Sequence, residues 1–202
     1  ENNENKNDNH NSIQINQLNE FLEANIFKIE KKINQFVKDI ILIIDRDEFL
    51  EIKLSLIKKN FENTLKKEDL TVILKDAKNQ IKDNYKNMTI VHMIIDKYLI
   101  DSKYFSHIPD LIKCQNFSVD LNFICLSDEL INEFEKILNN YQIKTKKILS
   151  GQYIKKHFEK DLGDIYSMSY KIIDGHNENE IKLVPKKREN KGFFEKFFNF
   201  FS

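Results

Sequence analysis

Apolar side chains recur along most of the chain with the spacing of short helices. Residues 13–37 are predicted to form an amphipathic helix, because apolar positions at three- and four-residue steps leave one polar face. The same spacing predicts helices over 68–85 and from Ser127 to Tyr141. Ser127 is a good N-cap, and Asp128 and Glu129 suit the positive end of the helix dipole. A further short helix is expected over 152–158.

Runs of β-branched and aromatic residues predict the strands. Residues 39–45, DIILIID, and 89–101, TIVHMIIDKYLID, are apolar on both faces, as buried strands are. Alternation predicts strands over 49–57 and 117–126, and 142–149 is expected to return as another. The charges of residues 45–48, DRDE, indicate a hairpin turn between the strands at 39–45 and 49–57. Residues 164–173 are expected to form one strand or a docking segment.

These elements predict an α+β fold of small mixed sheets with packed helices. A chain of 202 residues with 41% hydrophobic content can bury a real core in one medium or two small domains. Residues 1–12 are of low complexity and expected to be disordered, and 174–190 are polar, as in a linker. Lys and Arg total 32 and Asp and Glu also 32, so no overall basic field exists and no nucleic-acid partner is expected.

Several residues could be taken for catalytic or metal-binding residues. His92 could be a general base or metal ligand, but spacing places no nucleophile or second ligand beside it, so a histidine within a strand is favoured. Asp96 and Asp101 are expected to end this strand and begin the next turn. The carboxylates of residues 45–48 could bind Mg²⁺, yet a solvated turn is the commoner arrangement. Residues 174–180, DGHNENE, lack the order of acidic positions that a calcium loop requires.

The two cysteines, Cys114 and Cys125, form no CxxC pair and have no histidines at zinc-ligand spacing. Cys125 occupies an alternating apolar position, so we expect a buried thiol there. No enzymatic activity, cofactor or metal site is therefore predicted.

The last ten residues, FFEKFFNFFS, contain six of the sixteen phenylalanines. On a helical wheel of about 100° per residue these rings share an arc of roughly 160°. They are Phe193, Phe194, Phe197, Phe198, Phe200 and Phe201. The basic residues around them are Lys186, Lys187, Arg188, Lys191 and Lys196. Residues 191–202 are therefore predicted to form an amphipathic helix on an anionic membrane surface. A helix docked on the chain's own core and a peptide in a partner's groove are the alternatives.

Four segments in succession resemble FtsA, the actin-like bacterial cell-division family. They are KKEDLTVILKDAK (66–78), IVHMIIDKYLIDS (90–102), FSVDLNFICLSDELINEFEKIL (117–138) and YQIKTKKILSGQYI (141–154). They resemble the small inserted subdomain of FtsA, in which a helix that begins with a Glu-Asp pair leads to a strand that carries a histidine. The resemblance implies a remnant of an actin-like subdomain over 13–60, the inserted subdomain over 61–158, and a weak segment and charged linker over 159–190. A terminal amphipathic helix is also how FtsA attaches to the membrane.

The resemblance implies a septum-assembly protein, tethered peripherally to the cytoplasmic face of the inner membrane. It would contact other division proteins or itself through the inserted subdomain. Actin-type ATPases need glycine-rich phosphate loops, whereas Gly151, Gly163, Gly175 and Gly192 are far apart, so ATP binding is not expected. The part of FtsA that receives the FtsZ tail has no counterpart here, which puts direct FtsZ binding in doubt. The alternatives are a fragment of a full actin-like ATPase and a membrane-associated pilus or secretion assembly protein with an actin-like body.

Overall fold

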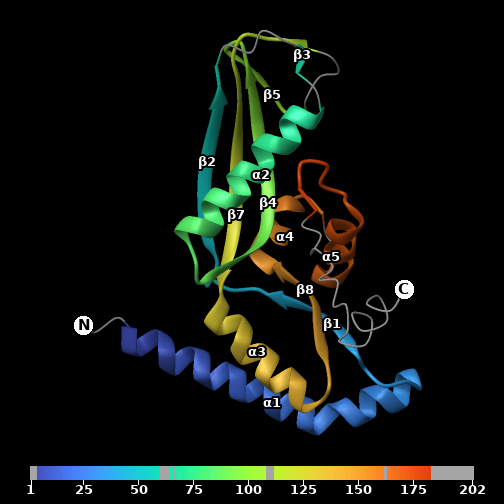
Figure 1. Cartoon of the computed structure of the whole chain (residues 1–202). Coiled ribbons are helices and arrows are strands. Elements are labelled where there is room, and N and C mark those ends of the chain that lie inside the picture. Colours follow the sequence, from blue (N-terminus) through green and yellow to red (C-terminus); the bar gives the residue numbers. More distant parts are fainter. Residues whose placement is uncertain (1–3, 60–63, 66, 108–111, 162, 183–202) are drawn as a thin grey trace, which may run out of the picture.

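The computed structural model describes residues 4–59, 64–65, 67–107, 112–161 and 163–182, arranged as in Figure 1. Its helices are α1 (Glu4–Ile33), α2 (Lys67–Asn84), α3 (Asp128–Asn140), α4 (Gly151–His157) and α5 (Ile165–Asp174). Its strands are β1 (Asp39–Ile44), β2 (Leu50–Lys58), β3 (Thr64–Leu65), β4 (Met88–Ile100), β5 (Lys103–Phe105), β6 (Ile112–Lys113), β7 (Phe117–Ser127) and β8 (Lys144–Ser150). The predicted α+β class is confirmed.

The strands β1 and β8 pair in parallel although about half of the chain, residues 45–143, lies between them. Asp39 faces Lys144 at one end of the pair, and Ile44 faces Ser150 at the other. The intervening chain builds a four-stranded sheet in the order β2-β7-β4-β5, which stands above the β1-β8 pair in Figure 1. A small sheet with its own helix, α2, is thus inserted between two neighbouring parallel strands.

The predicted hairpin between the strands at 39–45 and 49–57 is wrong. β2 pairs antiparallel with β7, from Leu50 opposite Cys125 to Lys58 opposite Phe117, and belongs to a different sheet from β1. The alternating apolar residues of β2 explain its pairing with β7. Leu54 of β2 lies opposite Leu121 of β7, whose side chain is buried. The charged residues between β1 and β2 therefore connect two sheets.

One face of the four-stranded sheet packs against α2. Ala77 and Ile81 of α2 lie in one cluster with Phe123 and Cys125 of β7. The β1-β8 pair lies between two helical layers, because Ile41 and Ile43 pack with the residues of α4 and α5, whereas Ile40 packs with those of α1 and α3. Alternate side chains of β1 thus enter opposite clusters, as a strand with two covered faces requires.

Two stretches differ from the sequence prediction. Residues 165–174 form α5 rather than a strand, capped by Asp164, whose carboxylate accepts from two backbone N–H groups, and ended by Gly175 at φ 90°. These are ordinary helix start and stop signals. The first helix begins at Glu4, so residues 4–12 are helical rather than disordered; no glycine or proline interrupts the chain from there to Ile33.

The predicted linker at 174–190 is also corrected over its described part. The Ile95 N–H donates to the Asn179 carbonyl at 2.9 Å, and the Ile181 N–H donates to the Met93 carbonyl at 2.8 Å. Glu180 thereby bridges to Ile94 as an added strand residue. The chain after α5 consequently covers the edge of β4 instead of leaving the body.

Replacing Ser127 with alanine is expected to lower the free energy of unfolding by about 1 kcal/mol, the usual contribution of an N-cap. The Ser127 hydroxyl accepts from the Leu130 N–H at 3.2 Å, so the first turn of α3 would lose this bond. Urea denaturation measures the difference. Ser55→Ala, at an exposed position of β2, is the control and should change the midpoint little. Equal effects of both substitutions would contradict the capping role.

Candidate functional site

The residues predicted to bind a membrane lie in the stretch 183–202, outside the described part of the structure. They are Phe193, Phe194, Phe197, Phe198, Phe200, Phe201, Lys186, Lys187, Arg188, Lys191 and Lys196. Among the described helices, none is both long enough and apolar enough to cross a bilayer. The membrane site therefore stays a prediction from sequence, and the described residues offer three other places for function.

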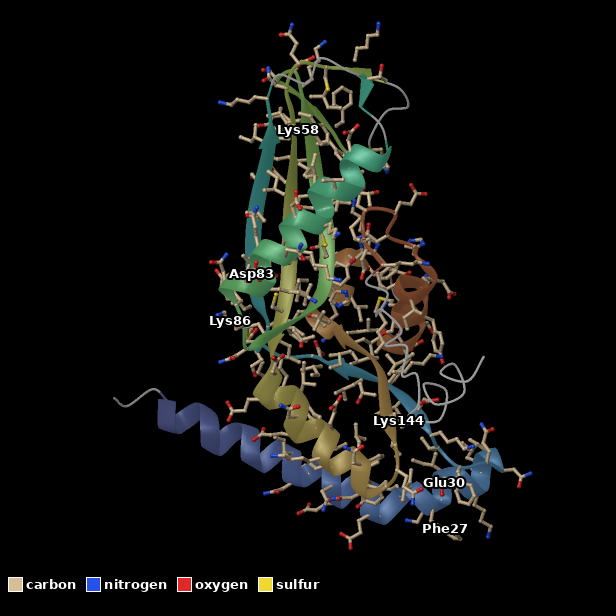
Figure 2. All side chains as sticks on the ribbon, in the orientation of Figure 1. Phe27, Glu30, Lys58, Asp83, Lys86 and Lys144 are labelled. Carbon is tan, nitrogen blue, oxygen red and sulfur yellow. The ribbon has the colours of Figure 1, made fainter. Side chains whose placement is uncertain are left out.

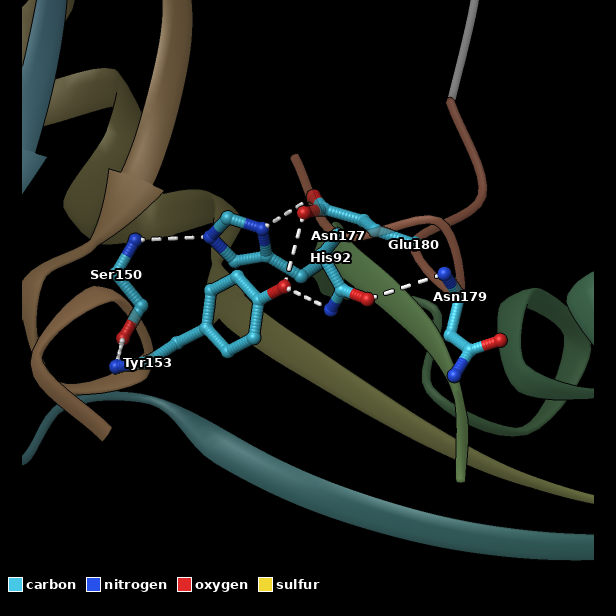
Figure 3. A network of polar contacts seen from close by, with 6 residues as sticks. All are labelled: His92, Ser150, Tyr153, Asn177, Asn179 and Glu180. Carbon is cyan, nitrogen blue, oxygen red and sulfur yellow. Dashed lines mark hydrogen bonds and ion pairs between the residues drawn. The ribbon is translucent and has the colours of Figure 1, made fainter. Parts of the chain in front are cut away.

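The first place is a buried polar network around His92 (Figure 3). The His92 side chain is fully buried on β4, next to a β-bulge between Ile90 and His92. Its Nδ1 lies 2.8 Å from Glu180 Oε1, and its Nε2 accepts from the Ser150 N–H at 3.0 Å. The Tyr153 hydroxyl donates to Glu180 Oε2 at 2.9 Å and accepts from Asn177 Nδ2 at 2.8 Å.

These contacts fix the protonation of the network. A backbone N–H can only donate, so His92 Nε2 must carry the lone pair and the proton sits on Nδ1, directed at Glu180. Burial raises the pKa of Glu180, but the His92 and Tyr153 hydrogen bonds and the positive charge of Lys147 outweigh it, so the net pKa is below its usual value. The imidazole is thus neutral and the carboxylate ionised.

A histidine beside a carboxylate can act as a general base only when its second nitrogen faces a reactant. Here that nitrogen is occupied by the Ser150 backbone, and the His92 side chain has no exposed surface. The network instead ties together β4, the start of α4 and the segment after α5. The sequence correctly placed His92 in a strand but missed Glu180, because no local spacing links residues 88 positions apart.

The two aspartates considered with His92 lie at different places in and after β4. Asp96 lies within β4, at its second irregularity, rather than at the strand end predicted. Burial raises its pKa, as does nearby Asp120, whereas Lys53 lowers it. Asp101 forms the turn expected of it: its carboxylate accepts from the Gln115 and Asn116 N–H groups at 2.9 and 2.8 Å.

The thiol of Cys125 is buried as predicted, and burial raises its pKa to about 11. Such a thiol is almost entirely protonated at neutral pH and is a poor nucleophile. Cys114 is buried as well, and its pKa is raised by burial and by the charge of Asp101.

The second place is the turn between β1 and β2, whose carboxylates could bind Mg²⁺ according to the sequence. Asp45 pairs with Lys155, Asp47 accepts from the side-chain amide of Gln152, and Glu48 pairs with Arg46 at 3.1 Å. Each carboxylate therefore has a partner of its own. Across the described residues, no three His, Cys, Asp or Glu side chains converge as metal ligands would. The turn serves to hold the first residues of α4.

The residues of the stretch DGHNENE (174–180) have unrelated structural roles. Gly175 ends α5, Glu180 enters the His92 network, and the Glu178 side chain is 80% exposed. Among the described residues, no three His, Cys, Asp or Glu side chains converge as metal ligands would, and this holds for those of this stretch.

The third place is an open groove of about 1420 Å³ between the base of β4, the β1-β8 pair and α5. Apolar side chains such as Ile90, Ile148 and Ile173 line it. Lysines also line it, namely Lys78, Lys82, Lys86, Lys146, Lys147 and Lys182. Burial, and then the charge of Lys82, lower the pKa of Lys78. Four carboxylates, Asp39, Glu135, Asp174 and Glu180, line the groove as well. The volume of the groove exceeds that of an ordinary small-molecule site.

Comparison with known proteins found no family model and no characterised sequence that matches the chain. The likeness to FtsA consequently rests on the order and pattern of the segments quoted above.

Proposed function

We propose that this protein is an FtsA-like, membrane-tethered adaptor of bacterial septum assembly, which acts through protein contacts at the cytoplasmic face of the inner membrane and catalyses no reaction. The observation that carries the proposal is the inserted sheet. Its chain leaves at the end of β1 and returns at the start of α3, and Ile44 of β1 lies in one buried cluster with Leu126 of β7 and Leu130 of α3. An inserted subdomain requires such adjacent ends, and the resemblance to FtsA concerns an inserted subdomain. The bounds differ from the 61–158 that the resemblance implies, because β2 belongs to the inserted sheet, whereas β8 pairs with β1 and α3 packs with α1.

The inserted sheet is held firmly where it meets the rest of the chain. His92 of β4 accepts from the Ser150 backbone, and Met93 and Ile95 of β4 exchange backbone hydrogen bonds with the segment after α5. The far end of the sheet projects away from the body in Figure 1. A projecting module on a rigid base suits an adaptor, because partners can reach it without displacing the elements below.

The tail provides the proposed membrane contact. Burying a Phe ring fully contributes about 1.5 to 3 kcal/mol, so six half-buried rings give on the order of 5 to 9 kcal/mol before the cost of ordering the tail. Lys186, Lys187, Arg188 and Lys191 would add about 1 kcal/mol each on an anionic leaflet. One copy would then bind reversibly, and several joined copies would bind much more firmly.

The glycines support the non-enzymatic part of the proposal. Gly151 packs against Asp45, and Gly175 ends α5 in a left-handed conformation. Each has a local structural role, and Gly163 precedes α5 in a turn stabilised by the Asp161 carboxylate. No two of them build a loop that could surround phosphates in the described structure.

The proposal is tested by sedimentation with liposomes containing anionic lipid. The unmodified chain is expected to pellet, whereas the double variant Phe194→Glu/Phe198→Glu should stay in the supernatant, since two charges on the apolar face oppose insertion. The matched control is Phe21→Glu/Phe27→Glu, which changes two rings of α1 that are 55% and 74% exposed. This control should still pellet. Pelleting of the tail variant would contradict the membrane assignment, and a saturable signal on nucleotide titration would contradict the non-enzymatic one.

A further inference from the structure

The strand β1 has an outer edge that lacks the features by which proteins usually protect such edges. Among the described residues it pairs with β8 alone, on one side. From Ile40 to Ile44 it contains no charged, polar or proline residue. By contrast, the edge strand β2 carries Glu51, Lys53 and Ser55 between its apolar residues, and β8 carries three lysines. Charges of this kind discourage pairing with another chain, so β2 is protected and β1 is not.

The sequence of β1 is that of a strand with neighbours on both sides. Continuous apolar strands occur in parallel sheets whose faces are covered and whose strands are flanked. Both faces of β1 are covered here, by α4 with α5 and by α1 with α3. Ile40, Ile41, Leu42 and Ile43 are only partly buried, and Ile40, Ile41 and Ile43 also line the groove beside α5. A strand added at the outer edge would cover more of their surface and pair the backbone groups that point outward.

Apolar side chains continue this edge beyond the strand. Ile33, at the end of α1, is 45% exposed, and Phe36, three residues before β1, is 78% exposed. α1 extends past the end of α3 in Figure 1, so its last turn has no helix packed over it. These two side chains thus adjoin the unprotected edge in the chain, with Lys38 and Asp39 between Phe36 and Ile40.

We propose that this surface binds a second copy of the chain, with the two β1 strands paired antiparallel about a two-fold axis. The result would be a continuous sheet in the order β8-β1-β1-β8. A two-fold contact brings a patch onto itself, so it favours patches without charge, and Ile40 to Ile44 meets that condition. Antiparallel pairing also places the two Asp39 residues at opposite ends of the paired segment. The inference uses only described residues and does not depend on the proposed function.

The test is sedimentation equilibrium of the full chain, without lipid, over a range of concentrations. A dimer is expected, and the double variant Ile33→Ser/Phe36→Ser should raise its dissociation constant about tenfold, because two exposed apolar side chains that flank the paired strands would no longer be buried on association. The matched control is Phe27→Ser. Phe27 is as exposed as Phe36, at 74%, but points away from α3 on the outer side of α1 in Figure 2. This control should leave the dissociation constant unchanged.

A second measurement locates the contact independently of any substitution. Hydrogen exchange of the backbone amides of residues 39–44 should slow as the protein concentration rises, whereas those of β2 should not change. The experiment is repeated with Phe194→Glu/Phe198→Glu to separate association through the tail. A monomer at every concentration, a dimer lost with the tail variant, or protection at β2 in place of β1 would each overturn the proposal.

Discussion

Replacing Gly151 with alanine is expected to lower the free energy of unfolding by about 1 to 3 kcal/mol, the usual cost of overpacking, and valine should cost more. An added Cβ at Gly151 would lie 2.6 Å from the Asp45 Cβ and 2.8 Å from its Cα. Asp45 directly follows β1, so relieving the clash means moving backbone where the parallel pair ends. Thermal and urea unfolding, followed by circular dichroism, measure the loss.

Gly163 is the matched control for this prediction. A Cβ there would meet its nearest atom, Asp161 Oδ1, at 3.4 Å, which is ordinary contact. Gly163→Ala should consequently leave the unfolding midpoint almost unchanged. If Gly151→Ala were equally harmless, the close packing of α4 on the end of β1 would be wrong.

The position of Gly151 explains why this site matters for the proposed adaptor. Ser150 and Gly151 lie where the inserted sheet, the β1-β8 pair and α4 meet, and Ser150 also donates to His92. A side chain at 151 would loosen the joint on which the inserted sheet stands. Function that depends on the direction of this sheet should then fail before the sheet itself unfolds.

Local patterns predicted most elements of the fold. Ser127, Asp128 and Glu129 marked the start of α3 correctly, because an N-cap and a first turn act within a few residues. The alternation at 117–126 and the apolar run at 89–101 became β7 and β4 for the same reason. These signals depend only on neighbours in sequence.

Pairing partners could not be predicted in this way. The hairpin at residues 45–48 was inferred from the nearness of two strands, yet β1 pairs with β8 and β2 with β7. The choice depends on which apolar faces can be buried together, and those faces lie far apart in the sequence. For the same reason the sequence does not predict Glu180 as the partner of His92. The polar stretch after α5 does not indicate that one of its carboxylates is buried.

Replacing Glu180 with alanine is expected to lower the free energy of unfolding by about 1 to 3 kcal/mol, the cost of leaving a buried polar group unpaired. The His92 Nδ1–H would lose its acceptor, and the Tyr153 hydroxyl would lose the carboxylate to which it donates. Exchange of the Ile95 and Ile181 amides should accelerate, since they hold the segment around Glu180 on β4. Glu178→Ala is the matched control, because that side chain is 80% exposed, and it should change neither quantity.

The same residue predicts a dependence on pH. The pKa of Glu180 in the folded chain lies below its ordinary value of 4.5, so its stabilising contribution is complete above that value. The contribution is lost as the pH falls below 4.5 and through the folded pKa, because protonation then costs the folded state more than the unfolded one. Glu180→Gln keeps the side-chain shape but cannot titrate, so its stability should fall less steeply over this range. Parallel pH profiles of the two proteins would show that Glu180 is not held ionised by His92 and Tyr153.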